Sequence, residues 1–115
     1  MRLRETDMSV YHVVQWSVSE PDADACGKAV EVIAEHVRAV HPAVASLRTY
    51  RQTVGPLPLR TYFVFAEYES LTAMDADPDT PACDEVWSPV FAAAQPGTFV
   101  VSIWSDPQRA SWFER

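Results

Sequence analysis

The chain has 115 residues, which predicts a single domain over 1–115, and hydrophobic residues make up 48% of it, as in a folded globular domain. The formal net charge is −7 and only nine residues are Lys or Arg. The chain therefore lacks the basic stripe of a nucleic-acid binder, and attraction to anionic membranes is disfavoured. No stretch approaches the ~18 apolar residues of a membrane span, and the charged first ten residues contain no apolar signal-peptide core. We expect a cytoplasmic protein.

The residues that usually hold metals and cofactors are sparse. Cys26 and Cys83 form no C-x-x-C motif, so we expect buried thiols, with a disulfide between them as the alternative. The three histidines include no H-x-x-x-H pair, which argues against a zinc site. Only three glycines occur and there is no G-x-G-x-x-G or P-loop, so no nucleotide cradle and no cofactor are predicted.

Residues 9–18 alternate in polarity and are rich in Val, Tyr and Trp, which predicts the first strand. A helix follows, with Ser19 or Asp22 as its N-cap and Pro21 in its first turn. It runs to about residue 41 and is stopped by Pro42. Its apolar stripe has spacings of three and four: Cys26, Ala29, Ile33, Val37 and Val40.

A hairpin is predicted next. Residues 44–54 and 59–68 form its two strands, and the turn signal "GPLP" at 55–58 joins them in antiparallel order. The segment 70–76 can form one or two helical turns capped by Ser70.

The second main helix lies between Pro81, near its start, and Gly97, which ends it. Pro89 predicts a kink or a break inside it. Its apolar face carries Trp87, Val90, Phe91 and Ala94. A fourth strand follows over 98–104, and Trp112 and Phe113 suggest that the tail, 106–115, docks on another surface.

The element order is β-α-β-β-α-β, with a faint internal repeat between 11–26 and 62–83. Both segments share the pattern Y-x-V, an acidic loop, and a helix that opens with cysteine. Two such halves predict an α+β, ferredoxin-like fold: a four-stranded antiparallel sheet with two helices on one face.

The strand pattern "YHVVQWSV", the segment "FVFAEYESLTAMDA" and Trp87 resemble the dimeric α/β-barrel superfamily over roughly residues 9–106. That superfamily includes antibiotic-biosynthesis monooxygenases, stress-responsive A/B-barrel proteins and small polyketide cyclases. The resemblance implies a homodimer in which two sheets pack face to face, with a pocket between the helices and sheet of each subunit. Strand 59–68 is apolar on both faces, which also favours a partner subunit.

The internal repeat aligns His12 with Phe63, which would place them on one face of neighbouring strands. Folding the hairpin about 55–58 pairs Tyr50 with Phe63 and Arg48 with Phe65, and a slip of one residue would reverse the face. One sheet face is then predicted to carry an aromatic pocket: His12, Trp16, Arg48, Tyr50, Phe63 and Phe65.

His12 is the predicted general base, because a histidine titrates near working pH. Tyr50 and Arg48 would stabilise an enolate or phenolate oxygen, while Trp87 and Phe91 would contact the substrate. The stress-responsive barrels and plant-type polyketide cyclases that this chain resembles often carry a histidine in the first strand, and His12 has a similar position. The alternative is a core histidine that donates to a backbone carbonyl.

Other polar groups have simpler interpretations. His36 lies at the edge of the helical stripe, and His41 at the helix end complements the dipole. Residues 75–79, "DADPD", fail the EF-hand pattern, because Thr80 and Val86 stand where Gly and Glu are needed. They are expected to be a solvated loop.

The leading hypothesis is a small cofactor-independent enzyme acting on an aromatic or polyketide-like metabolite by initial proton abstraction. Ring closure, isomerisation and oxygen insertion all remain open as the next step. Haem degradation in this superfamily uses an asparagine, and the chain has none. The alternative is a non-catalytic barrel that binds a small aromatic or hydrophobic ligand.

Overall fold

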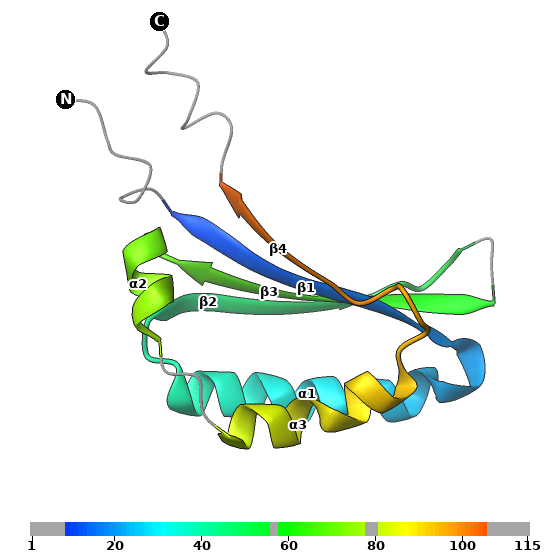
Figure 1. The fold of residues 1–115 in the computed structure, drawn as a ribbon. Coiled ribbons are helices and arrows are strands. Elements are labelled where there is room, and N and C mark those ends of the chain that lie inside the picture. The colour runs from blue at the N-terminus through cyan, green and yellow to red at the C-terminus, as the bar shows by residue number, and fades with distance from the viewer. Residues whose placement is uncertain (1–8, 56–57, 78–80, 106–115) are drawn as a thin grey trace, which may run out of the picture.

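The computed structural model describes residues 9–55, 58–77 and 81–105, which form one layer of strands and one of helices (Figure 1). The middle of the predicted turn at 55–58 and the tail with Trp112 and Phe113 lie outside the described residues. All neighbouring strands are antiparallel, in the order β2-β3-β1-β4, which confirms the ferredoxin-like fold. The strands are β1 (Val10–Ser19), β2 (Val44–Arg51), β3 (Leu59–Tyr68) and β4 (Val100–Ser105).

The two long helices lie on one face of the sheet, and no helix of the described residues lies on the other face (Figure 1). The short helix α2 lies near the end of β3. The helices are η2 (Glu20–Asp22, a single 3-10 turn), α1 (Ala23–Val40), α2 (Leu71–Ala76) and α3 (Pro81–Ala93). No helix among the described residues is long and apolar enough to cross a membrane. The cytoplasmic location stays a prediction.

Helix α1 buries most of the stripe that its sequence predicts, because residues three and four apart share one helical face, while Val37 and Val40 are partly buried. Ile33 is completely buried, and Cys26 is 3% exposed and not in a disulfide. Of the two predicted caps, neither side chain caps α1: the Ser19 hydroxyl donates to the Asp22 carboxylate instead, at 2.8 Å. The structure does not describe the side chain of Cys83, so the alternative of a disulfide stays a prediction.

Helix α2 begins as predicted, because the Ser70 hydroxyl accepts a hydrogen bond from the Ala73 amide at 3.0 Å. Helix α3 continues through Pro89 without a break. Gly97 follows with φ +78°, a left-handed conformation that favours glycine after a helix.

The register between β1 and β3 overturns one prediction. His12 pairs with Ala66, and Trp16 pairs with Tyr62, so the even-numbered residues of both strands point to the helices. The repeat matched His12 with the odd-numbered Phe63, which points to the opposite face. The shared Y-x-V pattern predicts that Tyr11 and Tyr62 lie on the same face. This is wrong, because Tyr62 is buried under the helices, whereas Tyr11 lies on the uncovered face. A one-residue offset is enough to exchange faces.

The hairpin register is confirmed: Tyr50 pairs with Phe63, and Arg48 pairs with Phe65. These four residues share a face with one another, but His12 and Trp16 lie on the other face. The predicted six-residue pocket is therefore split by the sheet itself.

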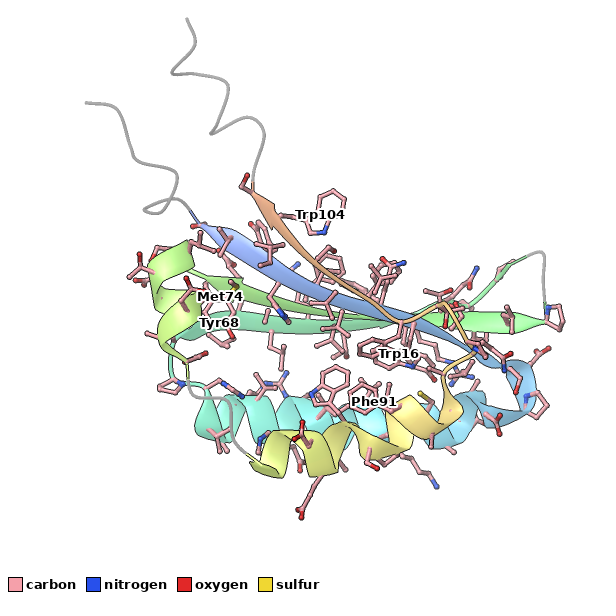
Figure 2. All side chains as sticks on the ribbon, viewed as in Figure 1. Trp16, Tyr68, Met74, Phe91 and Trp104 are labelled. Carbon is pink, nitrogen blue, oxygen red and sulfur yellow. The ribbon has the colours of Figure 1, made fainter. Side chains whose placement is uncertain are left out.

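The main core is built on Trp16, which is completely buried. Its ring stacks on Tyr62 at 5.6 Å between centroids, and its indole N–H donates to the Cys26 thiol at 3.2 Å. The Tyr62 hydroxyl donates to the Ala23 carbonyl oxygen. A smaller cluster of Val10, Ala66 and Tyr68 lies toward α2. Figure 2 shows Trp16 on the helix side of the sheet, and Tyr68 and Met74 at the α2 end.

The sheet face without helices, which we call the outer face, carries exposed apolar and aromatic side chains. Tyr50 is 49% exposed and Trp104 is 59% exposed, and Figure 2 shows Trp104 directed away from the helices. Phe63 and Phe65 are half-buried there, with ring centroids 5.7 Å apart. Strand β3 is thus apolar on both faces, as the sequence predicts.

Candidate functional site

A pocket of about 460 Å³ lies between the sheet and the helices, and we call it the helix-side pocket. Strands β1, β2, β3 and β4 form one wall, while α1, α2 and α3 supply the rest. Its lining combines members of both core clusters, so it occupies the region where the main core gives way to the smaller one. The lining residues are His12, Val14, Val37, His41, Leu47, Val64, Ala66, Tyr68, Met74, Asp77, Asp84, Trp87 and Ile103.

The size of neighbouring side chains explains why space remains there. Four residues along β1 and β3 from His12 and Ala66, the Trp16–Tyr62 pair fills the layer between sheet and helices with two stacked rings. At the pocket the facing pair is His12 and Ala66, and alanine contributes only a methyl group. Protein interiors are otherwise packed close to crystal density, so a local loss of side-chain volume leaves a cavity.

His12 lines this pocket from the middle of β1 and is half-buried. Burial lowers the pKa of His12 below its ordinary value of 6.5, and the electrostatic interaction with His41 lowers it further. Burial disfavours the charged imidazolium. The side chain is therefore neutral near pH 7 and able to accept a proton.

A second histidine faces a carboxylate in the same pocket. His41 follows α1, and its Nδ1 atom lies 3.5 Å from Oδ2 of Asp77, the residue that ends α2. Both side chains are shielded from solvent, with 14% exposure for His41 and 7% for Asp77. The other carboxylate oxygen of Asp77 accepts a hydrogen bond from the Ala43 amide at 3.3 Å. The pair joins the ends of α1 and α2 at one end of the pocket.

Helix α3 contributes Trp87 and Asp84 to the lining, and Asp84 is exposed. Trp87 meets the core ring of Trp16 edge-on, with centroids 5.7 Å apart. Phe91 stacks on Trp87 at 6.3 Å but is 54% exposed and lies outside this lining. Of the predicted substrate-contacting residues, Trp87 thus shares the pocket with His12, whereas Trp16 belongs to the core.

Arg48, Tyr50 and Phe65 line a different depression, of about 480 Å³, on the outer face. The Tyr50 and Phe65 rings meet edge-on at 5.6 Å. A hydrogen bond to Tyr50 raises the pKa of Arg48 above its ordinary value, so its guanidinium is charged. The sheet separates this group, together with Phe63, from His12. Within one subunit the four residues cannot assist a proton transfer at His12.

His41 and Asp77 are the pocket residues that sequence reasoning assigned to simpler roles. His41 fitted a dipole complement at a helix end, and Asp77 fell within the acidic run 75–79. Neither position has a motif that would reveal the pairing, since the chain between His41 and Asp77 folds back through the β2–β3 hairpin. Among the described residues, no group of three or more His, Cys, Asp or Glu side chains is arranged to hold a metal ion.

No protein-family model matches the chain, and no curated protein sequence matches it. Solved structures do match. A candidate antibiotic biosynthesis monooxygenase from Caulobacter crescentus is 17% identical, with a TM-score of 0.70, over 89% of this chain and 92% of that one. A second candidate antibiotic biosynthesis monooxygenase, from Nitrosomonas europaea, is 12% identical, with a TM-score of 0.69 over 92% and 95% of the two chains.

A third match is a dimeric protein of unknown function and ferredoxin-like fold from Bacteroides fragilis. It is 9% identical, with a TM-score of 0.66 over 85% of this chain and 96% of that one. At such identities the likeness establishes the fold. The chain has the ferredoxin-like fold of antibiotic-biosynthesis-monooxygenase-like proteins, so the predicted resemblance to that superfamily is confirmed at the level of the fold.

Proposed function

We propose that the protein is a small cofactor-independent enzyme that acts on an aromatic or polyketide-like metabolite in the helix-side pocket. The observation that carries this proposal is the placement of a neutral, half-buried His12 in a lining that is otherwise mostly aliphatic and aromatic. Apolar walls with a few converging polar groups are typical of small-molecule sites. The fold shared with candidate antibiotic biosynthesis monooxygenases supports the same class of reaction.

In the proposed first step His12 accepts a proton from an acidic carbon or a phenol of the substrate. The bond to that hydrogen breaks, and its electron pair remains on the substrate as an enolate or phenolate. Trp87 offers a flat apolar surface for the substrate ring. Ring closure, isomerisation or reaction with dioxygen would follow from this anion, and product analysis distinguishes them.

The test compares His12→Gln with wild type on a panel of hydroxynaphthalenes, anthrones and linear polyketide mimics, followed by mass spectrometry and oxygen uptake. Loss of a general base lowers turnover by roughly 10²- to 10⁴-fold. His36→Gln is the matched control, because His36 lies outside the pocket lining, and it should retain wild-type turnover. Wild-type turnover in His12→Gln would contradict the assignment of His12 as the base.

The alternative function is non-catalytic binding of the same class of ligand. The same lining supports it, because an apolar pocket with few polar groups binds ligands whether or not chemistry follows. Tight binding of panel members without any product in wild type would favour this alternative.

We also propose that the protein is a homodimer formed through the outer face. Large apolar patches on an uncovered sheet face usually mark an interface, and the Bacteroides fragilis protein of this fold is dimeric. In such a dimer Arg48, Tyr50, Phe63 and Phe65 would lie between the two sheets, which explains their aromatic character without a role in catalysis.

A further inference from the structure

The proposed proton abstraction leaves a negative charge on a substrate oxygen, and that charge needs a hydrogen-bond donor. Arg48 and Tyr50, the donors expected from the sequence, lie across the sheet from His12. The donor has to come from the helix-side pocket itself. Besides His12, the described lining residues with a ring N–H are His41 and Trp87, and of these two His41 is the one that faces a carboxylate.

The surroundings of His41 fix which side of its ring faces the pocket contents. Its Nδ1 atom faces Oδ2 of Asp77 at 3.5 Å, and both atoms are sealed from solvent. Oδ1 of the same carboxylate is tied to the Ala43 amide. A carboxylate held against one imidazole nitrogen orients the ring and selects the other nitrogen, Nε2, for contact with substrate.

We propose that His41, oriented by Asp77, donates a hydrogen bond from Nε2 to the enolate or phenolate oxygen that forms when His12 removes the proton. This inference rests on the proposed function. The proton from the substrate goes to His12, the electron pair stays on the substrate oxygen, and the Nε2–H of His41 donates without leaving the ring. His41 contacts the substrate, and Asp77 is a positioning residue that acts through His41.

The substrate is then a molecule that carries an ionisable phenol or enol oxygen. The two histidines then have separate roles in one pocket. A neutral imidazole on β1 accepts the proton, and a carboxylate-held imidazole at the end of α1 stabilises the resulting charge. A pair of donor and acceptor groups placed in a largely apolar cavity acts more strongly than in water.

The probe for this arrangement is 4-nitrophenol, whose phenolate is yellow and whose phenol is not. Full-length protein is titrated with it at the pH where half of the free compound is ionised. Indole fluorescence reports total binding, and visible absorbance reports the phenolate fraction among the bound molecules. In wild type we expect the bound phenolate-to-phenol ratio to exceed that in free solution by roughly tenfold, the effect of one charge-assisted hydrogen bond.

Two variants test the assignment. Asp77→Asn keeps the volume of the side chain and an acceptor for the Ala43 amide, and His41→Leu removes the donor. Both should lower the bound phenolate-to-phenol ratio roughly tenfold while total binding persists. Asp77→Asn carries the test alone if His41→Leu does not fold. Asp75→Asn is the matched control, because Asp75 is an exposed carboxylate on α2 that lies outside the pocket lining, and its ratio should equal that of wild type.

The possible failures are distinguishable. A wild-type ratio that exceeds free solution, depends on His12 and is unchanged in both Asp77→Asn and His41→Leu overturns the role of His41 alone. A wild-type ratio equal to that of free solution, or no binding of 4-nitrophenol, overturns the proposed proton abstraction in this pocket and the present inference with it. A merely structural Asp77 would alter folding or total binding, but not the ionised fraction of the bound probe.

Discussion

At the scale of single residues, His12 owes its lowered pKa to where it lies on β1. It shares the helix-facing side with Val14 and Trp16, so helices cover it and its imidazole loses much of its hydration. The same residue on the outer face would be flanked by Tyr11 and Val13 and would lie outside the helix-side pocket. Burial keeps it neutral, which is the form that a general base requires.

The lowered pKa of His12 predicts a dependence of stability on pH. In the unfolded chain His12 titrates near 6.5, whereas in the fold it titrates below that value, so the unfolded state binds more protons between the two pKa values. The contribution of His12 to stability is present above 6.5 and is lost as pH falls through the folded-state pKa. Urea unfolding of wild type and His12→Gln across this window should show a steeper acid loss in wild type. Parallel curves for the two proteins would contradict the assignment.

At the scale of elements, the pocket depends on where α2 begins and ends. Ser70 fixes the first turn of α2, Met74 lines the pocket, and Asp77 follows the last turn. The helix is only six residues long, so it depends on its cap and on packing. Disturbing its start therefore displaces side chains at the His41 end of the pocket.

Ser70→Ala should lower the free energy of unfolding by about 1 kcal/mol, because the amide of Ala73 loses its acceptor. Ser19→Ala is the matched control, since Ser19 precedes η2 but caps no helix amide, and it should cost less than about half of that value. Chemical denaturation of the two variants measures the difference. Equal costs would show that the Ser70 hydrogen bond contributes nothing specific.

Most elements could be predicted from the sequence because their signals are local. The alternation in β3, the stripe of α1 and the Ser70 cap each depend on residues a few positions apart, and the observed bounds agree with them closely. The hairpin register followed from one short turn. The pairing of β1 with β3 could not be derived in this way, because it joins segments that lie far apart in the sequence and the repeat aligned His12 with Phe63 on the wrong face.

The site was predictable only in part for the same reason. His12 and Trp87 were singled out by chemistry and share one pocket. Their assignment alongside Arg48 and Tyr50 depended on the long-range register and was wrong. The contact of His41 with Asp77 depends on how two helix ends meet in space, and no periodicity encodes that meeting.

At the scale of the whole molecule, the described residues place one layer of helices on one face of the sheet and nothing on the other face. The outer face collects rings from β2 and β3 and exposed apolar residues from β4, including Val100 and Trp104. An isolated sheet with one solvated face normally alternates apolar and polar residues. The proposed second subunit on the outer face would account for the departure from alternation in β3.

Phe65→Glu should therefore convert a homodimer into a monomer, because it would place a charge in the desolvated centre of the interface. Light scattering at micromolar concentration measures the mass of each protein. Val32→Glu is the matched control: Val32 is 52% exposed on α1, away from the outer face, and its variant should remain dimeric. A monomeric wild type would contradict the proposed assembly.

The central claim is that ligand binds on the helix side of the sheet and not on the outer face. Backbone and indole NMR shifts during titration with 2-naphthol, a hydroxylated bicyclic aromatic, test it directly. We predict that the largest shifts fall on His12, Met74 and the Trp87 indole, which line the helix-side pocket. Shifts confined to Tyr11, Tyr50 and their neighbours, which line the outer depression, would contradict the claim.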